Sequence, residues 1–327
     1  MKLLSIIVPC YNEEEVLPMF YEEIQKVMQQ MRDEHSELMF ELVFIDDGSK
    51  DKTLEILRRM ALEDGRVRYI SFSRNFGKEA GMYAGLENSR GDYVVVMDAD
   101  LQHPPAFLPK MYNYVKDGEF DCATTRRVSR EGESKVRSAF ARLFYKIMNK
   151  ISQTEIVDGA QDFRFMTRQM VNAILDMHEY NRFSKGIFSW VGFRTKYIEY
   201  ENVERPVGTS SWSFWGLFKY SLEGIFAFST APLAISAILG ALILVIAVIF
   251  LIVLIVKAIV VPEPDLRFLT ALCIFSLLSG LNLFCVGILG QYLSRTYLES
   301  KHRPIYLMRE NEEIYRERVS EKETDTE

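Results

Sequence analysis

The stretch VVVMDADLQHPP, residues 94–105, consists of an apolar run followed by two aspartates and, at its end, two prolines. Its four leading apolar residues predict a strand covered on both faces, and the two prolines at its end prevent that strand from continuing. Asp98 and Asp100 follow the strand directly. Ligands of open α/β sheets bind beyond the carboxyl ends of the strands, so both carboxylates stand where a ligand is expected.

Two carboxylates separated by one residue repel each other unless a cation lies between them. Mg²⁺ prefers oxygen ligands and is often shared between one or two carboxylates and the phosphates of a substrate. Asp98 and Asp100 therefore predict a site for a divalent ion and a diphosphate. The alternative is a solvated Asp-x-Asp turn that binds nothing.

Strand and helix patterns alternate on both sides of this stretch. Strands are predicted at residues 4–8, 40–45, 67–72, 92–97 and 121–125, and later within 157–165 and at 193–200. Helices are predicted at 13–32, capped by Asn12, at 52–63, capped by Asp51, at 79–89, and from Pro105 onward. This alternation predicts an α/β fold with a doubly wound, mostly parallel sheet.

Composition and missing motifs argue against several classes of protein. The 327 residues carry a net charge of −6, whereas a general nucleic-acid binder would show a basic patch or a high pI. The four cysteines form no Cys-x-x-Cys pair or Cys/His cluster, so neither a zinc site nor a disulfide framework is indicated. The sequence contains no P-loop motif and no GxGxxG after its first strand, which argues against nucleotide triphosphatases and dinucleotide-binding enzymes.

Two long apolar segments predict membrane spans. Residues 231–256 and 268–293 contain no charged residue, and each exceeds the roughly 20 residues needed to cross a bilayer. Cations are more numerous after the pair than between its members: Arg295, Lys301, Arg303 and Arg309 follow it, and Lys257 and Arg267 lie between. This bias places both termini in the cytoplasm.

Two further segments suit helices that lie at a membrane surface. Residues 137–151 show an amphipathic pattern with cations beside the apolar side, and residues 211–229 are rich in aromatic side chains. The first of these patterns fits a helix packed on the protein core equally well.

Five motifs in sequence order carry a family resemblance. They are PCYNE at 9–13, DDGS at 46–49, RNFGK at 74–78, DADLQHP at 98–104 and QDFR at 161–164. In this order the chain resembles family-2 glycosyltransferases. Within that family it is similar to the polyprenyl-phosphate glycosyltransferases, which include bactoprenol glucosyltransferases and dolichyl-phosphate mannose synthases. The resemblance covers about residues 3–300 and implies a glycosyltransferase A-type fold.

The resemblance implies a nucleotide diphosphate sugar as the donor, with UDP-glucose as first choice and UDP-N-acetylglucosamine as second. It implies donor-binding roles for Pro9, Tyr11, Glu13, one of Asp46 or Asp47, Asn75, Lys78 and Asp98. The first four positions hold the uridine, and Asp98 faces the ribose and diphosphate. Arg205 and Ser210 are candidates for the diphosphate. For Asn75 and Lys78 the alternatives are a plain turn and a surface lysine.

The same resemblance places Mg²⁺ or Mn²⁺ on Asp100 and Gln102, beside Asp98. Such an ion neutralises the charge that develops on the leaving nucleotide diphosphate. Asp162 lies near the reacting centre, where it either orients the acceptor or takes its proton. The implied reaction inverts the anomeric centre.

The implied acceptor is a polyprenyl phosphate such as undecaprenyl phosphate, so two anions must be brought together. Guanidinium groups suit phosphates because they bind them in a bidentate manner. The candidates for the lipid phosphate are Arg126, Arg127, Arg130 and Arg137. For each of these four arginines, the alternative is a solvated charge or a contact with lipid headgroups. For Arg164, the alternative is a structural ion pair.

These inferences divide the chain into four parts. They are a cytoplasmic nucleotide-sugar transferase domain at 1–210, an interfacial helix at 211–229, two transmembrane helices at 230–294 with a loop at 257–267, and a charged cytoplasmic tail at 295–327. The tail is expected to fray from residue 310 onward. The whole would be a multi-pass enzyme of the plasma membrane that makes a lipid-linked sugar for cell-envelope glycans.

Two other functions are compatible with parts of the sequence. A processive polysaccharide synthase would resemble Gln-x-x-Arg-Trp, whereas residues 161–165 read QDFRF, and two spans do not easily enclose a translocating glycan. A non-catalytic membrane scaffold that assists a flippase would not need its carboxylates intact. The resemblance also allows a homotetramer, with a flippase and downstream transferases as partners, but no residue specifies either.

Overall fold

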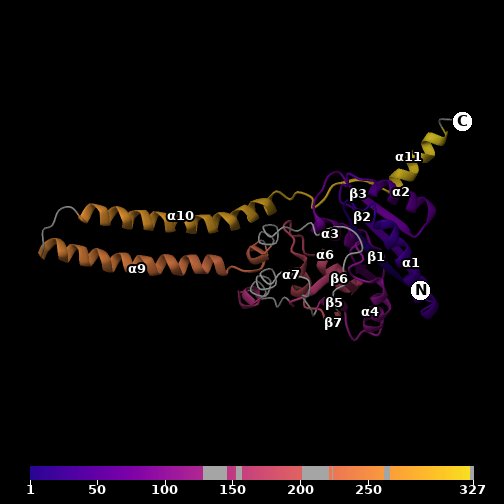
Figure 1. Cartoon of the computed structure of the whole chain (residues 1–327), viewed down its shortest axis with the longest axis horizontal. Coiled ribbons are helices and arrows are strands. Elements are labelled where there is room, and N and C mark those ends of the chain that lie inside the picture. The colour runs from indigo at the N-terminus through magenta and orange to yellow at the C-terminus, as the bar shows by residue number, and fades with distance from the viewer. Residues whose placement is uncertain (128–145, 152–156, 201–220, 223, 261–265, 325–327) are drawn as a thin grey trace.

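The structure is a computed structural model of the full chain and describes residues 1–127, 146–151, 157–200, 221–222, 224–260 and 266–324. An α/β domain lies at one end, and two long helices extend from it side by side (Figure 1). The described strands form one eight-stranded mixed sheet in the order β7-β5-β6-β4-β1-β2-β3-β8. The predicted fold class is therefore confirmed.

The strands are β1 (Lys2–Cys10), β2 (Leu38–Asp46), β3 (Val67–Phe72), β4 (Tyr93–Val96), β5 (Cys122–Arg127), β6 (Ala160–Thr167), β7 (Thr195–Tyr200) and β8 (Met308–Asn311). The helices of the domain are α1 (Leu17–Glu34), α2 (Thr53–Glu63), α3 (Lys78–Asn88), the 3₁₀ turn η1 (Pro105–Phe107), α4 (Leu108–Val115), α6 (Arg168–Leu175), α7 (Ser184–Trp190) and α11 (Glu312–Thr324). The two long helices are α9 (Ala231–Val260) and α10 (Leu266–Ser300). Every predicted strand is present, with bounds that differ by at most two residues.

Helices cover both faces of the sheet because successive side chains of a strand point in opposite directions. Along β1, Leu4, Ile6 and Val8 pack in one core with apolar residues of α1, α2 and α4. Ile7 faces the other way and packs in a second core with residues of α3, α6 and α7. The buried runs of the central strands thus correspond to a sheet covered on both sides, as their composition predicts.

The carboxyl ends of the central strands meet at one edge of the sheet. Strand β1 pairs in parallel with β2 and with β4, so all three end on the same side. Strand β6 runs antiparallel to β4, with Val96 opposite Arg164. Asp98 and Asp162 each lie two residues beyond this pair, and both contact Lys78. The sheet topology therefore brings together two carboxylates that lie far apart in the sequence.

The predicted start of the first helix is wrong. Helix α1 begins at Leu17, and Asn12 adopts a φ of 56° in the connection that precedes it. The side chain of Asn12 accepts a hydrogen bond from the backbone N–H of Lys50 at 2.8 Å. The N–H of Glu13 donates to the hydroxyl of Thr53 at 2.8 Å. Because the loop before α2 satisfies these groups, the helix does not need to begin here.

The prediction of a fraying carboxy-terminal tail is also wrong for residues 310–324. Strand β8 pairs antiparallel with β3 and completes that edge of the sheet, and α11 follows beside α2 (Figure 1). Glu310 is only 1% exposed, and both of its carboxylate oxygens accept hydrogen bonds from Arg58 at 2.7 Å. The charged composition of this segment predicts a solvated tail. Strand pairing with β3 and ion pairs with arginines hold the segment in the fold instead.

Helices α9 and α10 contain segments long and apolar enough to cross a membrane, at Ala231–Phe250 and Thr270–Ser300. Of the residues in the most apolar part of each, only 6% and 0% are buried, so neither is the core helix of a folded domain. Helix α9 ends at Val260 and helix α10 begins at Leu266, so both helices include residues of the loop predicted at 257–267. Of the predicted interfacial helices, residues 137–145, 211–220 and 223 lie outside the described residues.

Candidate active site

Lys78 lies between two carboxylates at the carboxyl edge of the sheet. It is the first residue of α3, and its Nζ lies 2.8 Å from Oδ1 of Asp98 and 3.0 Å from Oδ2 of Asp162. Asp98 follows β4 and Asp162 belongs to β6, so three elements contribute to this contact. The three side chains are 38%, 26% and 21% exposed, which leaves the group partly accessible from solvent.

The contact shifts the pKa of Lys78 and the pKa of Asp162. Burial alone would raise the pKa of Asp162, but Lys78 and Lys185 outweigh it and hold that pKa well below its usual value. Burial alone would lower the pKa of Lys78, but Asp162 and Asp98 outweigh it and raise that pKa. Asp162 is therefore a carboxylate and Lys78 a cation throughout the neutral range.

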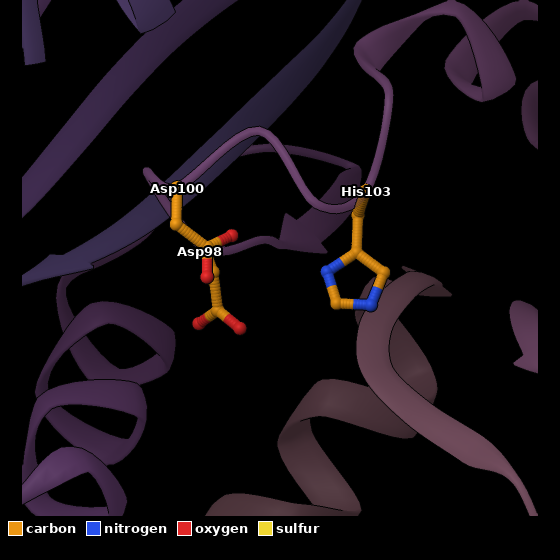
Figure 2. Close-up of side chains that lie close together, drawn as sticks. All are labelled: Asp98, Asp100 and His103. Carbon is orange, nitrogen blue, oxygen red and sulfur yellow. The ribbon is translucent and has the colours of Figure 1, made fainter. Parts of the chain in front are cut away.

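The segment after Asp98 turns back over the sheet edge. Leu101 has a φ of 56°, a left-handed conformation that reverses the chain, and the N–H of Gln102 donates to Oδ1 of Asp100 at 3.1 Å. This turn brings Asp98, Asp100 and His103 together, with one ligand atom from each lying within 4.8 Å of the others. Figure 2 shows the carboxylates of Asp98 and Asp100 close together, with a ring nitrogen of His103 on the side that faces them.

His103 is the member of this cluster that the sequence prediction missed. It is 6% exposed, and its Nδ1 has no hydrogen-bond partner among the described residues. Burial lowers the pKa of the imidazole, although Asp98 and Asp100 act in the opposite direction. Its position in DADLQHPP, directly before two prolines, does not by itself indicate a metal ligand.

The donor set fits a divalent ion. Two carboxylates and a buried imidazole nitrogen without a hydrogen-bond partner among the described residues supply ligand atoms that lie close together, although Asp98 also contacts the ammonium of Lys78. The predicted ligand Gln102 is half-buried in the same turn, next to the cluster. An acidic, metal-competent cluster is thus present where the sequence predicts one.

The two aspartates at the end of β2 shape the neighbouring loops. Asp46 accepts hydrogen bonds from the Ser71 hydroxyl at 2.7 Å and the Ser49 N–H at 3.0 Å. Asp47 accepts from the N–H groups of Phe76 at 2.6 Å and Gly77 at 2.9 Å, while burial raises its pKa. Both aspartates therefore hold the walls of a site at this edge, and a contact with uridine remains a prediction.

Gly48 lets these two loops approach each other closely. Its φ is 67°, and a Cβ atom there would lie 2.6 Å from the backbone carbon of Arg74. A glycine is therefore required for the turn at 46–49 to pack on the loop at 74–78. This packing places the start of α3, and with it Lys78, against the end of β2.

The other predicted donor residues lie along the same edge. Pro9 is half-buried near the end of β1, Tyr11 is 41% exposed beyond it, and Glu13 is half-buried before α1. Asn75 is exposed in the loop that Asp47 holds. The structure thus gathers the amino-terminal motifs around one sheet edge, while Arg205 and Ser210 lie outside the described residues.

The predicted acceptor arginines are only partly described. The Nε of Arg126 donates to the carbonyl of Asp158 at 3.1 Å, and its guanidinium lies 3.8 Å from Glu199. Arg127 is half-buried at the end of β5. Arg130 and Arg137 lie outside the described residues. The role of all four remains a prediction.

Helix α7 supports the β6 side of the site. Glu79, next to Lys78, accepts hydrogen bonds from the N–H and hydroxyl of Ser184 at the start of α7. Arg164 is 3% exposed and lies 4.4 Å over the ring of Phe188 in the same helix. Arg164 is thus held by an aromatic ring, which the alternative of a structural ion pair does not anticipate.

The sequence and the fold were compared with those of known proteins. The family profile described as glycosyl transferase family 2 matches residues 5–175. The CsbB protein of Bacillus subtilis (strain 168) is 42% identical over 308 residues, which are 94% of this chain and 92% of CsbB. A bactoprenol glucosyl transferase of Shigella phage SfV is 38% identical over 306 residues, which are 94% of this chain and 98% of that protein.

Among solved structures, a glucosyl-3-phosphoglycerate synthase of Mycobacterium tuberculosis, in complex with Mn²⁺, uridine diphosphate and phosphoglyceric acid, has a TM-score of 0.46. It is 19% identical, and the match covers 69% of this chain and 76% of that one. The family profile spans more than half of the chain, and relatives match nearly all of it. The chain therefore belongs to glycosyltransferase family 2.

Proposed function

We propose that this enzyme transfers a sugar from a nucleotide diphosphate sugar to a polyprenyl phosphate, with UDP-glucose as the first-choice donor and UDP-N-acetylglucosamine as the second. The observation that carries the proposal is the position of Asp98, Asp100 and Asp162 at one sheet edge, in a chain whose two apolar helices are unburied. The match to a bactoprenol glucosyl transferase over 98% of that protein supports the acceptor class and the sugar.

Asp98 and Asp100, with Gln102 beside them, would hold Mg²⁺ or Mn²⁺, which supplies positive charge to the departing diphosphate. Asp46 and Asp47 keep the loops at 46–49 and 74–78 in place, so the donor meets a preformed wall. The uridine would lie against this wall, near Pro9, Tyr11 and Glu13.

The acceptor phosphate is an anion before it reacts, since a phosphate monoester has a second pKa near about 6. Strong base catalysis is therefore unnecessary. A carboxylate whose pKa is held below its usual value is a weak base, so Asp162 would orient the acceptor rather than take a proton. Lys78, between Asp162 and Asp98, would offset the repulsion between these carboxylates and the incoming phosphate.

A membrane location follows from the acceptor and from the helices. A polyprenyl chain is very apolar and leaves only its phosphate accessible at the headgroup plane. We infer that α9 and α10 cross the plasma membrane and that the α/β domain faces the cytoplasm, as the cations after α10 indicate. A homotetramer and a flippase partner are compatible with this arrangement.

The test is a transfer assay with the purified full chain, polyprenyl phosphate, Mn²⁺ or Mg²⁺, and a panel of labelled nucleotide sugars. We expect a labelled lipid with UDP-glucose and at least about 100-fold less product from Asp100→Asn. Asp117→Asn, at an exposed aspartate two residues after α4, is the matched control and should retain full activity. If the folded wild-type protein labels no lipid with any donor, the proposal is wrong and the scaffold function gains support.

A further inference from the structure

We propose that His103 is a third protein ligand of the divalent ion held by Asp98 and Asp100, and that it makes the site favour Mn²⁺ over Mg²⁺. This inference rests on the proposed function, because it requires an ion at the aspartate pair. It adds to that function the identity of the ion and a residue outside the predicted ligand set.

The first observation is an unsatisfied polar atom in a buried position. His103 is 6% exposed, and its Nδ1 has no hydrogen-bond partner among the described residues. Leaving such an atom unpaired costs about 1–3 kcal/mol, so buried polar atoms usually have a partner. A bound ion would supply that partner.

The second observation is the direction of the ring. Figure 2 shows a ring nitrogen of His103 on the side that faces Asp98 and Asp100. One ligand atom from each residue lies within 4.8 Å of the others. Ligands of an octahedral ion at about 2.1 Å lie about 3 Å apart when adjacent and about 4.2 Å apart when opposite, so small side-chain movements would bring all three onto one ion.

The third observation is that two aromatic rings lie close to the imidazole. Its centroid lies 5.8 Å from that of Phe163 in β6 and 5.9 Å from that of Tyr200 in β7. Pro104 and Pro105 follow directly and restrict the backbone. Ligand positions supported in this way are typical of binding sites, since rotamers fixed by packing lower the cost of ordering the ligands.

The chemical type of the ligand atoms determines whether the site binds Mg²⁺ or Mn²⁺ more tightly. Mg²⁺ takes oxygen ligands almost exclusively, whereas imidazole suits transition-metal ions. A site with two carboxylates and one imidazole nitrogen should therefore bind Mn²⁺ more tightly than Mg²⁺. A site built from Asp98, Asp100 and Gln102 alone would offer only oxygen and should distinguish the two ions much less.

The experiment measures ion binding without substrate, so it does not depend on activity. Mn²⁺ is titrated into the purified full chain in detergent and followed by electron paramagnetic resonance, with Mg²⁺ as a competitor. Pulsed measurements on the bound Mn²⁺ then report whether a ¹⁴N nucleus is directly coordinated. We expect nitrogen coupling in the wild type and a clear preference for Mn²⁺.

Two substitutions separate coordination from packing. His103→Phe keeps an aromatic ring between Phe163 and Tyr200 but removes the donor atom, and it should weaken Mn²⁺ binding about 10-fold or more and abolish the nitrogen coupling. His103→Gln offers an oxygen instead, and it should abolish the coupling and narrow the preference for Mn²⁺ over Mg²⁺. The exposed His178→Gln is the matched control and should behave as wild type.

Asp100→Asn distinguishes failure of this inference from failure of the proposed function. If Asp100→Asn loses Mn²⁺ while His103→Phe binds it as wild type does, the metal site stands and the role of His103 is overturned. If the wild type shows bound Mn²⁺ without nitrogen coupling, the role of His103 is likewise overturned. If Asp100→Asn binds Mn²⁺ as tightly as wild type, the ion is not at this cluster and both proposals lose their basis.

Discussion

Two groups of charged side chains, in different parts of the same sheet, are paired in different ways. At the β3–β8 edge, Glu310 is paired with Arg58 by two hydrogen bonds of 2.7 Å, and Glu312 accepts from Arg68 at 2.9 Å. At the carboxyl edge, one lysine serves Asp98 and Asp162 together, and the His103 Nδ1 beside them has no hydrogen-bond partner among the described residues. The carboxylates of the first group are paired with arginines. In the second group the Nδ1 atom of His103 is still able to bind a ligand.

The choice of cation explains this difference. A guanidinium fixes a carboxylate through a planar fork, whereas an ammonium is a compact charge on a flexible stem that can turn to another anion. An arginine therefore suits a permanent connection between distant segments. A lysine suits a site that must rearrange when a charged substrate enters. The two regions can be separated experimentally, because one should govern stability and the other activity.

The largest expected effect is on the carboxyl edge. Asp162→Asn should lower kcat/KM about 1000-fold, which corresponds to about 4 kcal/mol of transition-state stabilisation, because it removes the carboxylate that is proposed to orient the acceptor. Its thermal unfolding midpoint should stay at or above that of wild type. The lipid-labelling assay and differential scanning fluorimetry measure the two quantities. Asp33→Asn, exposed on α1, is the control, and a near-wild-type rate for Asp162→Asn would contradict the assignment.

The next effect belongs to the β3–β8 edge. Arg58→Met leaves the buried Glu310 without its main partner and should lower the free energy of unfolding of the domain by about 3 kcal/mol. Its kcat/KM per folded molecule should remain unchanged. Arg59→Met, at the exposed neighbouring position, is the matched control for denaturant unfolding. A loss of activity without a loss of stability would show that this edge also serves the reaction.

A smaller effect tests the geometry of the cation. Lys78→Arg keeps the positive charge but replaces a compact ammonium with a planar fork that cannot bridge Asp98 and Asp162 in the same way. We expect kcat/KM to fall about 10-fold with little change in the unfolding midpoint. Steady-state kinetics with varied UDP-sugar measure the change. Full activity in Lys78→Arg would mean that only the charge matters.

The smallest effect concerns pH. Burial acts to raise the pKa of Glu310, but the hydrogen bonds from Arg58 and Tyr69 outweigh it and leave that pKa below its usual value. A carboxyl whose pKa is lower in the folded state stabilises the fold at neutral pH, and this contribution is lost as the pH falls below about 4. Unfolding of wild type should therefore be more sensitive to pH between about 5 and 3 than unfolding of Glu310→Gln. Equal sensitivity would contradict the pairing.

The sequence predicts the sheet and the acidic site because their signals are local. Apolar runs closed by polar turns identify every strand from β1 to β7, and Asp98 and Asp100 lie directly after one of them. Two other features depend on contacts that local patterns do not contain. Asn12 resembles a helix cap in the sequence, but the loop at 49–53 lies beside it in the fold. Residues 310–324 resemble a solvated tail, but Glu310 of β8 pairs with Arg58 and Glu312 of α11 pairs with Arg68.

His103 illustrates a different limit. Its neighbours in the motif attract attention because carboxylates are recognised metal ligands, whereas one histidine before two prolines carries no signal of its own. Only burial, ring direction and the orphaned Nδ1 separate it from an ordinary aromatic core residue. The rings that lie close to His103 belong to Phe163 in β6 and Tyr200 in β7, which are far from residue 103 in the sequence.

Strand β8 also sets an order on the biosynthesis of the protein. Its partner β3 is made early, yet β8 follows α9 and α10, so the β3 edge stays open until both apolar helices have left the ribosome. An open edge strand can pair with other chains. The sheet thus closes only in molecules that carry the complete apolar pair, and a chain truncated before β8 would expose the β3 edge to aggregation and to proteolytic quality control.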